Sequence, residues 1–351
     1  MTSRVYLVDD SAVIRGLIGR IIDSDPELAI AGTAANGELA LKGIPGASPD
    51  LVVLDVEMPV MDGLETLRRL HAEHPSIPVV MFSTKTERGA AATVEALSLG
   101  AADYATKPSA VGGRAPLDSV KDELLTKIKA LVGSTPAPAQ PMRPAAPRRP
   151  LRTRLRAPSA IAVASSTGGP AALETVLSSI DKPLPVPVFV AQHMPPLFTS
   201  LLADRLDKAG PSTVVEVAEP VVAQPGTWYL AAGGRHMIVA PDDGSGQIRL
   251  LPDDQPPIRR CRPSADLLFE TASRRFGSDL LSVVLSGMGA DGSVGAEEVV
   301  ASGGRVVAQD EASSVVWGMP GSVVRNGTAD TELSLDEVGP WLASQCSAVL
   351  R

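Results

Sequence analysis

The stretch Ala164-Ser165-Ser166-Thr167-Gly168-Gly169-Pro170 decides how the second half of this chain folds and what it could do. It follows the apolar run 160–163 and precedes a helix-like segment, 171–180. The two glycines allow a sharp turn, and proline suits the first turn of a helix, where its missing N–H costs nothing. The sequence therefore predicts a serine hydroxyl at a strand-to-helix corner beside free backbone N–H groups, which suits a nucleophile and an oxyanion. A Ser/Thr cap of the helix is the simpler alternative.

A histidine and an aspartate follow two other apolar runs of this half. His193 comes directly after the run 188–191, and Asp291 lies in the glycine-rich loop 286–292 that follows another run. The carboxyl ends of parallel strands meet at one edge of a sheet, so Ser166, His193 and Asp291 would lie together there. They would act as nucleophile, base and orienting acid, in that order. The chain order differs from that of α/β-hydrolases, but such a triad is defined by geometry. A loop histidine and a helix N-terminal acid remain the alternatives.

Three further features of this half have weaker functional interpretations. The spacing Gly287, Gly289, Gly292 matches a dinucleotide-binding turn, with Asp310 placed as the ribose acid, but Asp291 would then face the pyrophosphate. His236 is predicted to be structural, between short strands of a meander formed by 214–218, 228–232 and 237–240. Cys261 lies between two arginines, but no base is adjacent in the sequence, so it too is predicted to be structural.

The first 132 residues alternate between strand-like and helix-like segments. Apolar runs occur at 4–8, 28–32, 51–54, 79–82 and 102–106, and helical spacing occurs at 12–22, 64–70, 88–99 and 117–132. Continuous apolar strands that alternate with helices predict a doubly wound α/β domain, flavodoxin-like, with a parallel sheet covered on both faces. Ligands of such sheets bind at the carboxyl ends of the strands.

Polar residues gather at those predicted strand ends. Asp9 and Asp10 end the first strand, Asp55 the third, Ser83 the fourth and Lys107 the fifth. Three carboxylates at one edge repel each other unless a hard cation joins them, and Mg²⁺ suits such an oxygen-rich site. A lysine and a hydroxyl beside an aspartate could assist phosphoryl transfer to that carboxylate. Acids that merely terminate strands are the alternative.

Length and composition bound the remaining possibilities. A chain of 351 residues predicts two domains, and the segment 133–159, with seven prolines, six arginines and no acid, predicts a flexible linker between domains at 1–132 and 160–351. This basic segment lacks aromatic residues for base stacking, so nucleic-acid binding is not expected. No apolar run approaches the ~20 residues of a membrane span, and no signal-peptide layout opens the chain. The two cysteines, Cys261 and Cys346, give no disulfide framework. Together these features predict a soluble cytoplasmic protein.

The first domain resembles the receiver domain of response regulators. The matching motifs are Asp9-Asp10, the segment 55–63 (DVEMPVMDG) and Thr106-Lys107-Pro108. The resemblance implies that Asp55 accepts a phosphoryl group from a histidine kinase, with Lys107 and Ser83 contacting that group. It implies Mg²⁺ bound by Asp9, Asp10, Asp55 and the backbone carbonyl of Glu57. Tyr104 occupies the position of the family's switch aromatic, although a half-buried core ring is equally compatible.

The second domain resembles the catalytic domain of the chemotaxis protein-glutamate methylesterases, the CheB family, through the segments 165–169, 192–196 and 287–292. The resemblance implies a Rossmann-like α/β fold with a mostly parallel sheet. It also implies hydrolysis of glutamate γ-methyl esters, and deamidation of glutamines, on the cytoplasmic domains of chemoreceptors. Where the family usually has Gly-Ala before the nucleophile, this chain has Ala164-Ser165.

The residue roles that this resemblance implies are Ser166 as nucleophile, His193 as base, Asp291 as orienting acid and the Met288 backbone N–H as an oxyanion donor. Thr167 would hydrogen-bond His193 or cap the helix. No cofactor is expected in the esterase step and no insertion into the membrane, while phosphorylation of Asp55 is expected to activate the enzyme. Two alternatives stay open: a phosphorylation-controlled binding module with an inactive triad, and an esterase of a non-flagellar chemosensory pathway.

Overall fold

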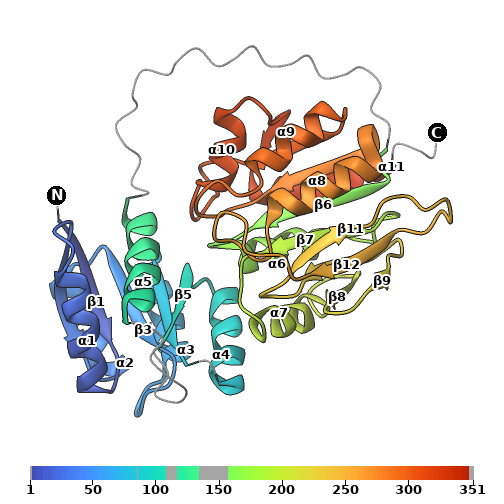
Figure 1. The fold of residues 1–351 in the computed structure, drawn as a ribbon. Coiled ribbons are helices and arrows are strands. Elements are labelled where there is room, and N and C mark those ends of the chain that lie inside the picture. The colour runs from blue at the N-terminus through green and yellow to red at the C-terminus, as the bar shows by residue number, and fades with distance from the viewer. Residues whose placement is uncertain (1, 85, 108–116, 134–156, 348–351) are drawn as a thin grey trace. The chain divides into compact units, whose positions relative to one another are not determined.

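The computed structural model describes residues 2–84, 86–107, 117–133 and 157–347, which fold into two compact units within 1–138 and 139–351 (Figure 1). Pro108 and most of the predicted linker, 134–156, lie outside the described residues. Within the described ranges, no helix combines the length and the apolar character that crossing a bilayer requires.

The first unit is a five-stranded parallel sheet covered by helices on both faces, which confirms the predicted doubly wound fold (Figure 1). The strand order is β2-β1-β3-β4-β5. The strands are β1 (Ser3–Val8), β2 (Leu28–Ala34), β3 (Leu51–Asp55), β4 (Val79–Ser83) and β5 (Asp103–Thr106). The helices are α1 (Ala12–Asp23), α2 (Gly37–Ala47), α3 (Gly63–Glu73), α4 (Glu87–Ser98) and α5 (Leu117–Val132). Helices α1 and α5 pack together, and α3 packs against both α2 and α4.

Local sequence signals explain most of these boundaries. Thr86 caps α4 by accepting a hydrogen bond from the Gly89 N–H, and Gly100, just past the helix, has a φ of 101° that favours glycine. The sequence analysis missed α2, because glycines and Pro45 interrupt its apolar spacing. Asn36 nevertheless starts this helix by accepting the N–H of Leu39, and Ala40 and Ile44 bury its inner face.

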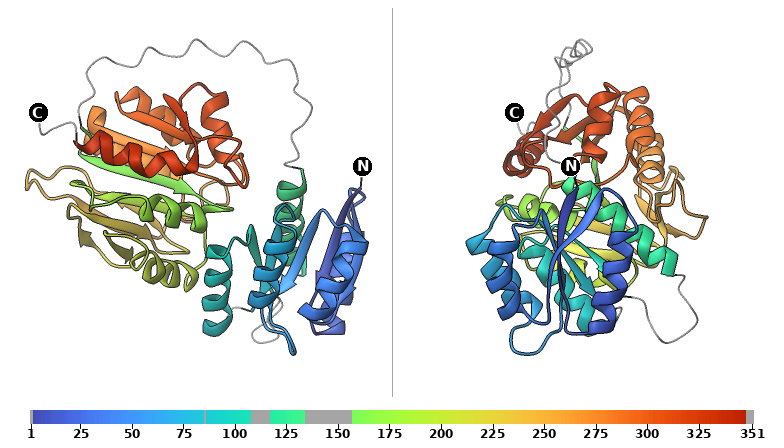
Figure 2. Two further views of the ribbon diagram at one scale, coloured as in Figure 1. Left: turned by 180° about the vertical axis from the view of Figure 1, so that it is seen from behind. Right: turned by 90° about the vertical axis from the view of Figure 1, so that its left-hand side faces the viewer.

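The second unit is built on a seven-stranded sheet in which every adjacent pair is parallel, as the predicted Rossmann-like fold requires (Figure 2). In spatial order the strands are β15 (Thr331–Leu333), β14 (Arg305–Gln309), β13 (Leu280–Val284), β6 (Ala160–Ser165), β7 (Val188–Gln192), β10 (Thr227–Ala231) and β8 (Thr213–Val217). The helices are α6 (Gly169–Ser178), α7 (Phe198–Leu206), α8 (Ala265–Phe276), α9 (Ser293–Ala301), α10 (Met319–Arg325) and α11 (Leu335–Ser347).

The predicted meander was wrong. Strands β8 and β10 join the parallel sheet, while a separate antiparallel sheet has the order β11 (His236–Val239), β12 (Arg249–Asp253) and β9 (Val221–Val222). His236 therefore opens a strand and does not lie between two. Short apolar runs show where strands form, but their spacing does not reveal which partner each will pair with.

Helix α8 connects the two sheets of this unit. Alternate residues of β6, namely Ala160, Ala162 and Ala164, belong to the same buried cluster as Leu268 and Phe269 of α8. Small side chains on that face of the strand let the helix pack closely. The other contacts of α8 reach β11 and α9, so the start of this helix is fixed among several elements.

Candidate active sites

The Ser166 corner is a strand-to-helix turn, as the sequence predicted, but the N–H groups of Ser166 and Gly169 are hydrogen-bonded and not free. Strand β6 ends at Ser165, and α6 begins at Gly169 after Gly168, which has a φ of 75°. Gly168 is the N-cap residue of α6 and no side-chain cap is made, so the helix-cap interpretation of the serines is wrong. The Ser166 N–H donates to the Ser286 carbonyl (3.0 Å), and its carbonyl accepts from the Gly169 N–H (2.8 Å). The corner is therefore held by backbone hydrogen bonds.

The two adjacent serines occupy different environments. Ser165 is fully buried and its hydroxyl donates to Gln192 Oε1 (2.6 Å), while Gln192 Nε2 donates to the Ser166 carbonyl (2.9 Å). Ser166 is only partly buried. The Ser165 hydroxyl is thus occupied inside the protein, which leaves Ser166 as the candidate nucleophile. Sequence reasoning missed Gln192, because its role depends on a hydroxyl 27 residues away.

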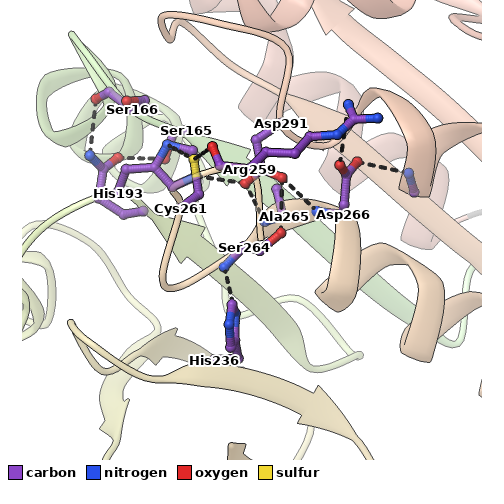
Figure 3. Close-up of polar contacts among 12 residues, drawn as sticks. Ser165, Ser166, His193, His236, Arg259, Cys261, Ser264, Ala265, Asp266 and Asp291 are labelled. Atoms are coloured by element: carbon purple, nitrogen blue, oxygen red, sulfur yellow. Dashed lines mark hydrogen bonds and ion pairs between the residues drawn. The ribbon is translucent and has the colours of Figure 1, made fainter. Parts of the chain in front are cut away.

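His193 leaves the sheet beside Ser166 because of the strand register. Ser165 on β6 pairs with Gln192 on β7, so the residues after them emerge at the same edge, and the His193 N–H donates to the Ser165 carbonyl (3.1 Å). The Nε2 atom of His193 lies 2.7 Å from Asp291 Oδ2 (Figure 3). Among the described contacts, no hydrogen bond joins the Ser166 and His193 side chains. Since Asp291 occupies Nε2, the nitrogen left for proton transfer is Nδ1, the reverse of the serine-protease arrangement.

Asp291 is held as an anion by donors at the start of α8. Its carboxylate accepts from Ser264 Oγ (2.9 Å) and from the N–H groups of Ala265 (2.7 Å) and Asp266 (3.1 Å) (Figure 3). Burial favours a higher pKa for Asp291, but the hydrogen bond with His193 and these N–H groups lower it. Asp291 therefore caps α8, although it precedes α9 in sequence. This fixes the carboxylate that orients His193.

The same contact changes the proton affinity of His193. Burial of its ring disfavours the charged form, but hydrogen bonding to Asp291 and the nearby sulfur of Cys261 together raise the pKa of His193 to about 9. An unperturbed histidine titrates near 6.5. At neutral pH the imidazole is therefore mainly protonated, and the fraction able to act as a base grows with pH.

Two other residues of the second unit lie close to this group. Cys261 Sγ is 3.9 Å from His193 Nδ1, so a base that is not adjacent in the sequence does lie beside this cysteine; the two residues are 68 positions apart, which hid the contact. His236 is buried, with Nδ1 accepting from the Ser264 N–H (3.1 Å) and Nε2 3.2 Å from the Pro256 carbonyl. Both nitrogens of His236 are thus engaged with backbone, which agrees with a structural role.

The loop that follows β13 packs directly on the Ser166 corner. A Cβ added at Gly287 would clash with Met319 Sδ and lie 3.0 Å from the Ser166 Cβ, so a larger residue there would force these neighbours or the loop to shift. The Ser286 hydroxyl donates to the carbonyl of Thr167 (2.8 Å), which is buried. Met288 is the next residue along the loop and is partly exposed, and its role as an oxyanion donor stays a prediction.

The dinucleotide interpretation of this loop has no support in the geometry. The Asp310 carboxylate accepts from the Ser313 N–H (3.0 Å) and Ser313 Oγ (2.6 Å), so it is occupied within its own loop. A pyrophosphate bound by this loop would need hydrogen-bond donors, but the loop instead carries the Asp291 carboxylate, which accepts from the Ala265 N–H at the start of α8 and contacts His193.

The first unit has a second polar site at the carboxyl edge of its sheet. Lys107 Nζ lies 2.7 Å from Asp9 Oδ2 and 2.8 Å from Asp55 Oδ2, and Asp10 lines the same pocket. Burial raises the pKa of Asp55 to about 6, although Lys107 acts in the opposite direction. The predicted grouping of these side chains is thus present.

The acidic cluster fits a Mg²⁺ ion in its donor chemistry. Asp9, Asp10 and Asp55 each offer a carboxylate oxygen within 4.8 Å of the others. Asp9 Oδ2 is buried and has no partner in hydrogen-bond geometry, although Lys107 lies at ion-pair distance. Glu57 lines the pocket too, so its carbonyl is available nearby. Hard oxygen donors of this kind are those that Mg²⁺ prefers.

Two more residues singled out in the sequence of this unit, Ser83 and Tyr104, are buried. The Ser83 hydroxyl donates to the Gly89 carbonyl (3.0 Å) beside the pocket. The Tyr104 ring packs inside the unit with Lys127 Nζ 4.5 Å from its centroid. In this structure Tyr104 is therefore a core ring.

Comparison with known proteins finds a family model for each of the two units. The family model for the response regulator receiver domain matches residues 5–112, and that for the CheB methylesterase matches residues 161–342. The chain belongs to the CheB methylesterase family. A relative from Nocardioides sp. is 45% identical over 96% of this chain and 93% of its own length, and one from Caulobacter vibrioides is 45% identical over 99% of each. Both are called protein-glutamate methylesterase/protein-glutamine glutaminase.

A solved structure supports the CheB-family fold of the second unit. The catalytic domain of the Thermotoga maritima CheB methylesterase is 36% identical, with a TM-score of 0.51, over 53% of this chain and 98% of that domain. The similarity thus includes nearly the whole of that domain.

Proposed function

We propose that this CheB-family chain hydrolyses glutamate γ-methyl esters on chemoreceptors and deamidates receptor glutamines, under the control of its receiver domain. The observation that carries the proposal is the 2.7 Å contact between His193 and Asp291 at the sheet edge where Ser166 emerges. Ser166, His193 and Asp291, which we propose as nucleophile, base and orienting acid, each follow a different strand of the parallel sheet. The rival interpretation, a binding module with an inactive triad, would not require that arrangement.

In the acylation step, Ser166 Oγ attacks the ester carbonyl while His193 Nδ1 accepts its proton. Asp291 accepts the Nε2–H, which fixes the tautomer that leaves Nδ1 free and stabilises the imidazolium. The oxyanion is bound by backbone N–H groups, with that of Met288 as the candidate donor. The imidazolium then returns the proton to the departing methoxide, and methanol leaves.

Deacylation repeats the same proton transfers with water. His193 Nδ1 takes a proton from water, whose oxygen attacks the acyl carbonyl, and then protonates Ser166 Oγ as the glutamate acid is released. With a glutamine side chain, the group that leaves in the first step is ammonia. The products are in both cases a glutamate side chain and regenerated Ser166.

Regulation is proposed to begin at Asp55. Its carboxylate would accept the phosphoryl group from a histidine kinase, with Lys107 and Ser83 contacting the transferred group. Asp9, Asp10, Asp55 and the Glu57 carbonyl would hold Mg²⁺, which when bound offsets the charge of the phosphoryl oxygens. Modification of the receiver then raises the esterase rate. Methylated chemoreceptors are the proposed substrates.

The test is methanol release from methylated receptor membranes, with Mg²⁺ and a small phosphodonor. Wild type, Ser166→Ala and Ser165→Ala are compared, since the two serines are neighbours with different contacts. We expect release by wild type and Ser165→Ala and none above background by Ser166→Ala. Equal release by Ser166→Ala and wild type would contradict the proposed nucleophile, and no release by wild type from any methylated receptor would contradict the activity.

A further inference from the structure

The sulfur of Cys261 and a ring nitrogen of His193 lie close enough to contact the same small ion. Cys261 is partly buried, and its Sγ lies 3.9 Å from His193 Nδ1 (Figure 3). Two backbone hydrogen bonds between Ile258 and Cys261 close a tight turn, from the Cys261 N–H (2.8 Å) and the Ile258 N–H (3.1 Å). The thiol is therefore held beside the ring by a defined turn and does not belong to an extended loop.

This distance suits two ligands of one thiophilic cation. With Zn–S bonds of about 2.3 Å and Zn–N bonds of about 2.0–2.1 Å, two ligand atoms on a tetrahedral ion are about 3.6 Å apart. The observed 3.9 Å separation of Sγ and Nδ1 differs from this by a few tenths of an ångström. On its other side, the ring of His193 is bonded through Nε2 to Asp291. A carboxylate that holds the second nitrogen is the usual support for a metal-binding histidine.

We propose that Cys261 Sγ and His193 Nδ1 bind one thiophilic divalent cation, of which Zn²⁺ is the type, and that the bound ion inhibits hydrolysis. Binding displaces the thiol proton and, from the imidazolium that predominates at neutral pH, the Nδ1 proton. The ion then bonds to the thiolate and to the Nδ1 lone pair, and water fills the remaining positions. The inhibition rests on the proposed function, because the blocked lone pair is the one that would accept the Ser166 proton. The binding itself does not depend on it.

The surrounding charges set this site apart from the acidic cluster of the receiver. Arg259 faces Asp266 at 3.8 Å, and Arg262 donates to the Gln255 carbonyl (3.2 Å). Both guanidinium groups are engaged with oxygen acceptors, and the Asp291 carboxylate is bonded to His193, so the preference for one cation over another depends on the soft sulfur and the imidazole. The site should therefore reject Mg²⁺ and accept Zn²⁺, Cd²⁺ or Co²⁺.

The binding test uses the metal-free full chain and Co²⁺, with excess Mg²⁺ present to fill the receiver cluster. The readout is the near-ultraviolet absorption band that a thiolate–cobalt bond produces. We expect one equivalent of Co²⁺ to produce the band in wild type and in Cys346→Ser, the matched control that removes the other, buried cysteine. Cys261→Ser and His193→Gln should lose it. A band that persists in Cys261→Ser, or its absence from wild type, would overturn the site.

The inhibition test follows methanol release against Zn²⁺ concentration, with each variant compared with its own metal-free rate. Wild type and Cys346→Ser should be inhibited and recover after chelation, and Cys261→Ser should need at least tenfold more Zn²⁺. Equal sensitivity of Cys261→Ser would place the inhibitory ion elsewhere and refute this part. If wild type releases no methanol, the proposed function fails, while the cobalt band still decides the metal site.

Discussion

Two buried aspartates at the carboxyl edges of two parallel sheets, Asp55 and Asp291, have pKa values shifted in opposite directions. Each is less than 5% exposed. Asp291 accepts hydrogen bonds from Ser264 Oγ and two backbone N–H groups besides its contact with His193, and its pKa is lowered. Asp55 faces Lys107 and a distant N–H of Glu57 (3.4 Å), and burial raises its pKa to about 6.

The difference lies in the number of donors and not in the depth of burial. A carboxylate with its lone pairs filled stays ionised and fixed, which suits a group that only orients and stabilises an imidazolium. A carboxylate with few donors keeps a more basic oxygen, which suits a group that must form a bond to phosphorus.

Asp291→Asn should lower kcat for ester hydrolysis by about 10⁴, because the amide favours the wrong histidine tautomer. Methanol release in single-turnover and steady-state assays measures this. Asp310→Asn is the matched control, since that carboxylate bonds only within its own loop, and it should stay near the wild-type rate. Similar losses in both variants would indicate general damage to the unit.

The raised pKa of His193 predicts an alkaline pH profile. Because the neutral ring is the base, kcat/KM should rise about tenfold from pH 7 to 8 and level off near the pKa of about 9. The pH profile is measured in the Asp55→Asn variant, so that titration of Asp55 in the receiver does not contribute to it. A plateau that begins near pH 6.5 would show that Asp291 and Cys261 do not raise the histidine pKa.

Asp55→Asn should also remove the stimulation by a phosphodonor, which we expect to be severalfold in wild type. The stimulated rate divided by the unstimulated rate should fall to about one in this variant. Stimulation that survives the substitution would place the phosphorylation site elsewhere.

Ser165→Ala should have the smallest effect. Removing its hydroxyl leaves the buried Gln192 Oε1 without its donor, which costs about 1–3 kcal/mol of unfolding free energy. Thermal unfolding of the full chain should show a lower Tm for the unit that contains this site. Activity should fall less than tenfold, in contrast to Ser166→Ala.

The receiver site was easier to predict from sequence than the esterase site, for a physical reason. Asp9, Asp55 and Lys107 each end an apolar strand, so their convergence follows from a parallel sheet alone. Ser166 and His193 share that property. By contrast, the donors to Asp291 come from the start of α8, and Cys261 arrives on a turn after the small antiparallel sheet. Those contacts depend on how α8 and the loops pack, which strand spacing does not encode.

We propose Ser166, activated by His193 and Asp291, as the nucleophile. A serine-directed fluorophosphonate, followed by mass spectrometry of the digested chain, tests it most directly. We predict stoichiometric labelling at Ser166 in wild type and greatly slowed labelling in Asp291→Asn. Labelling at Ser165 or Cys261, with Ser166 unmodified, would contradict it.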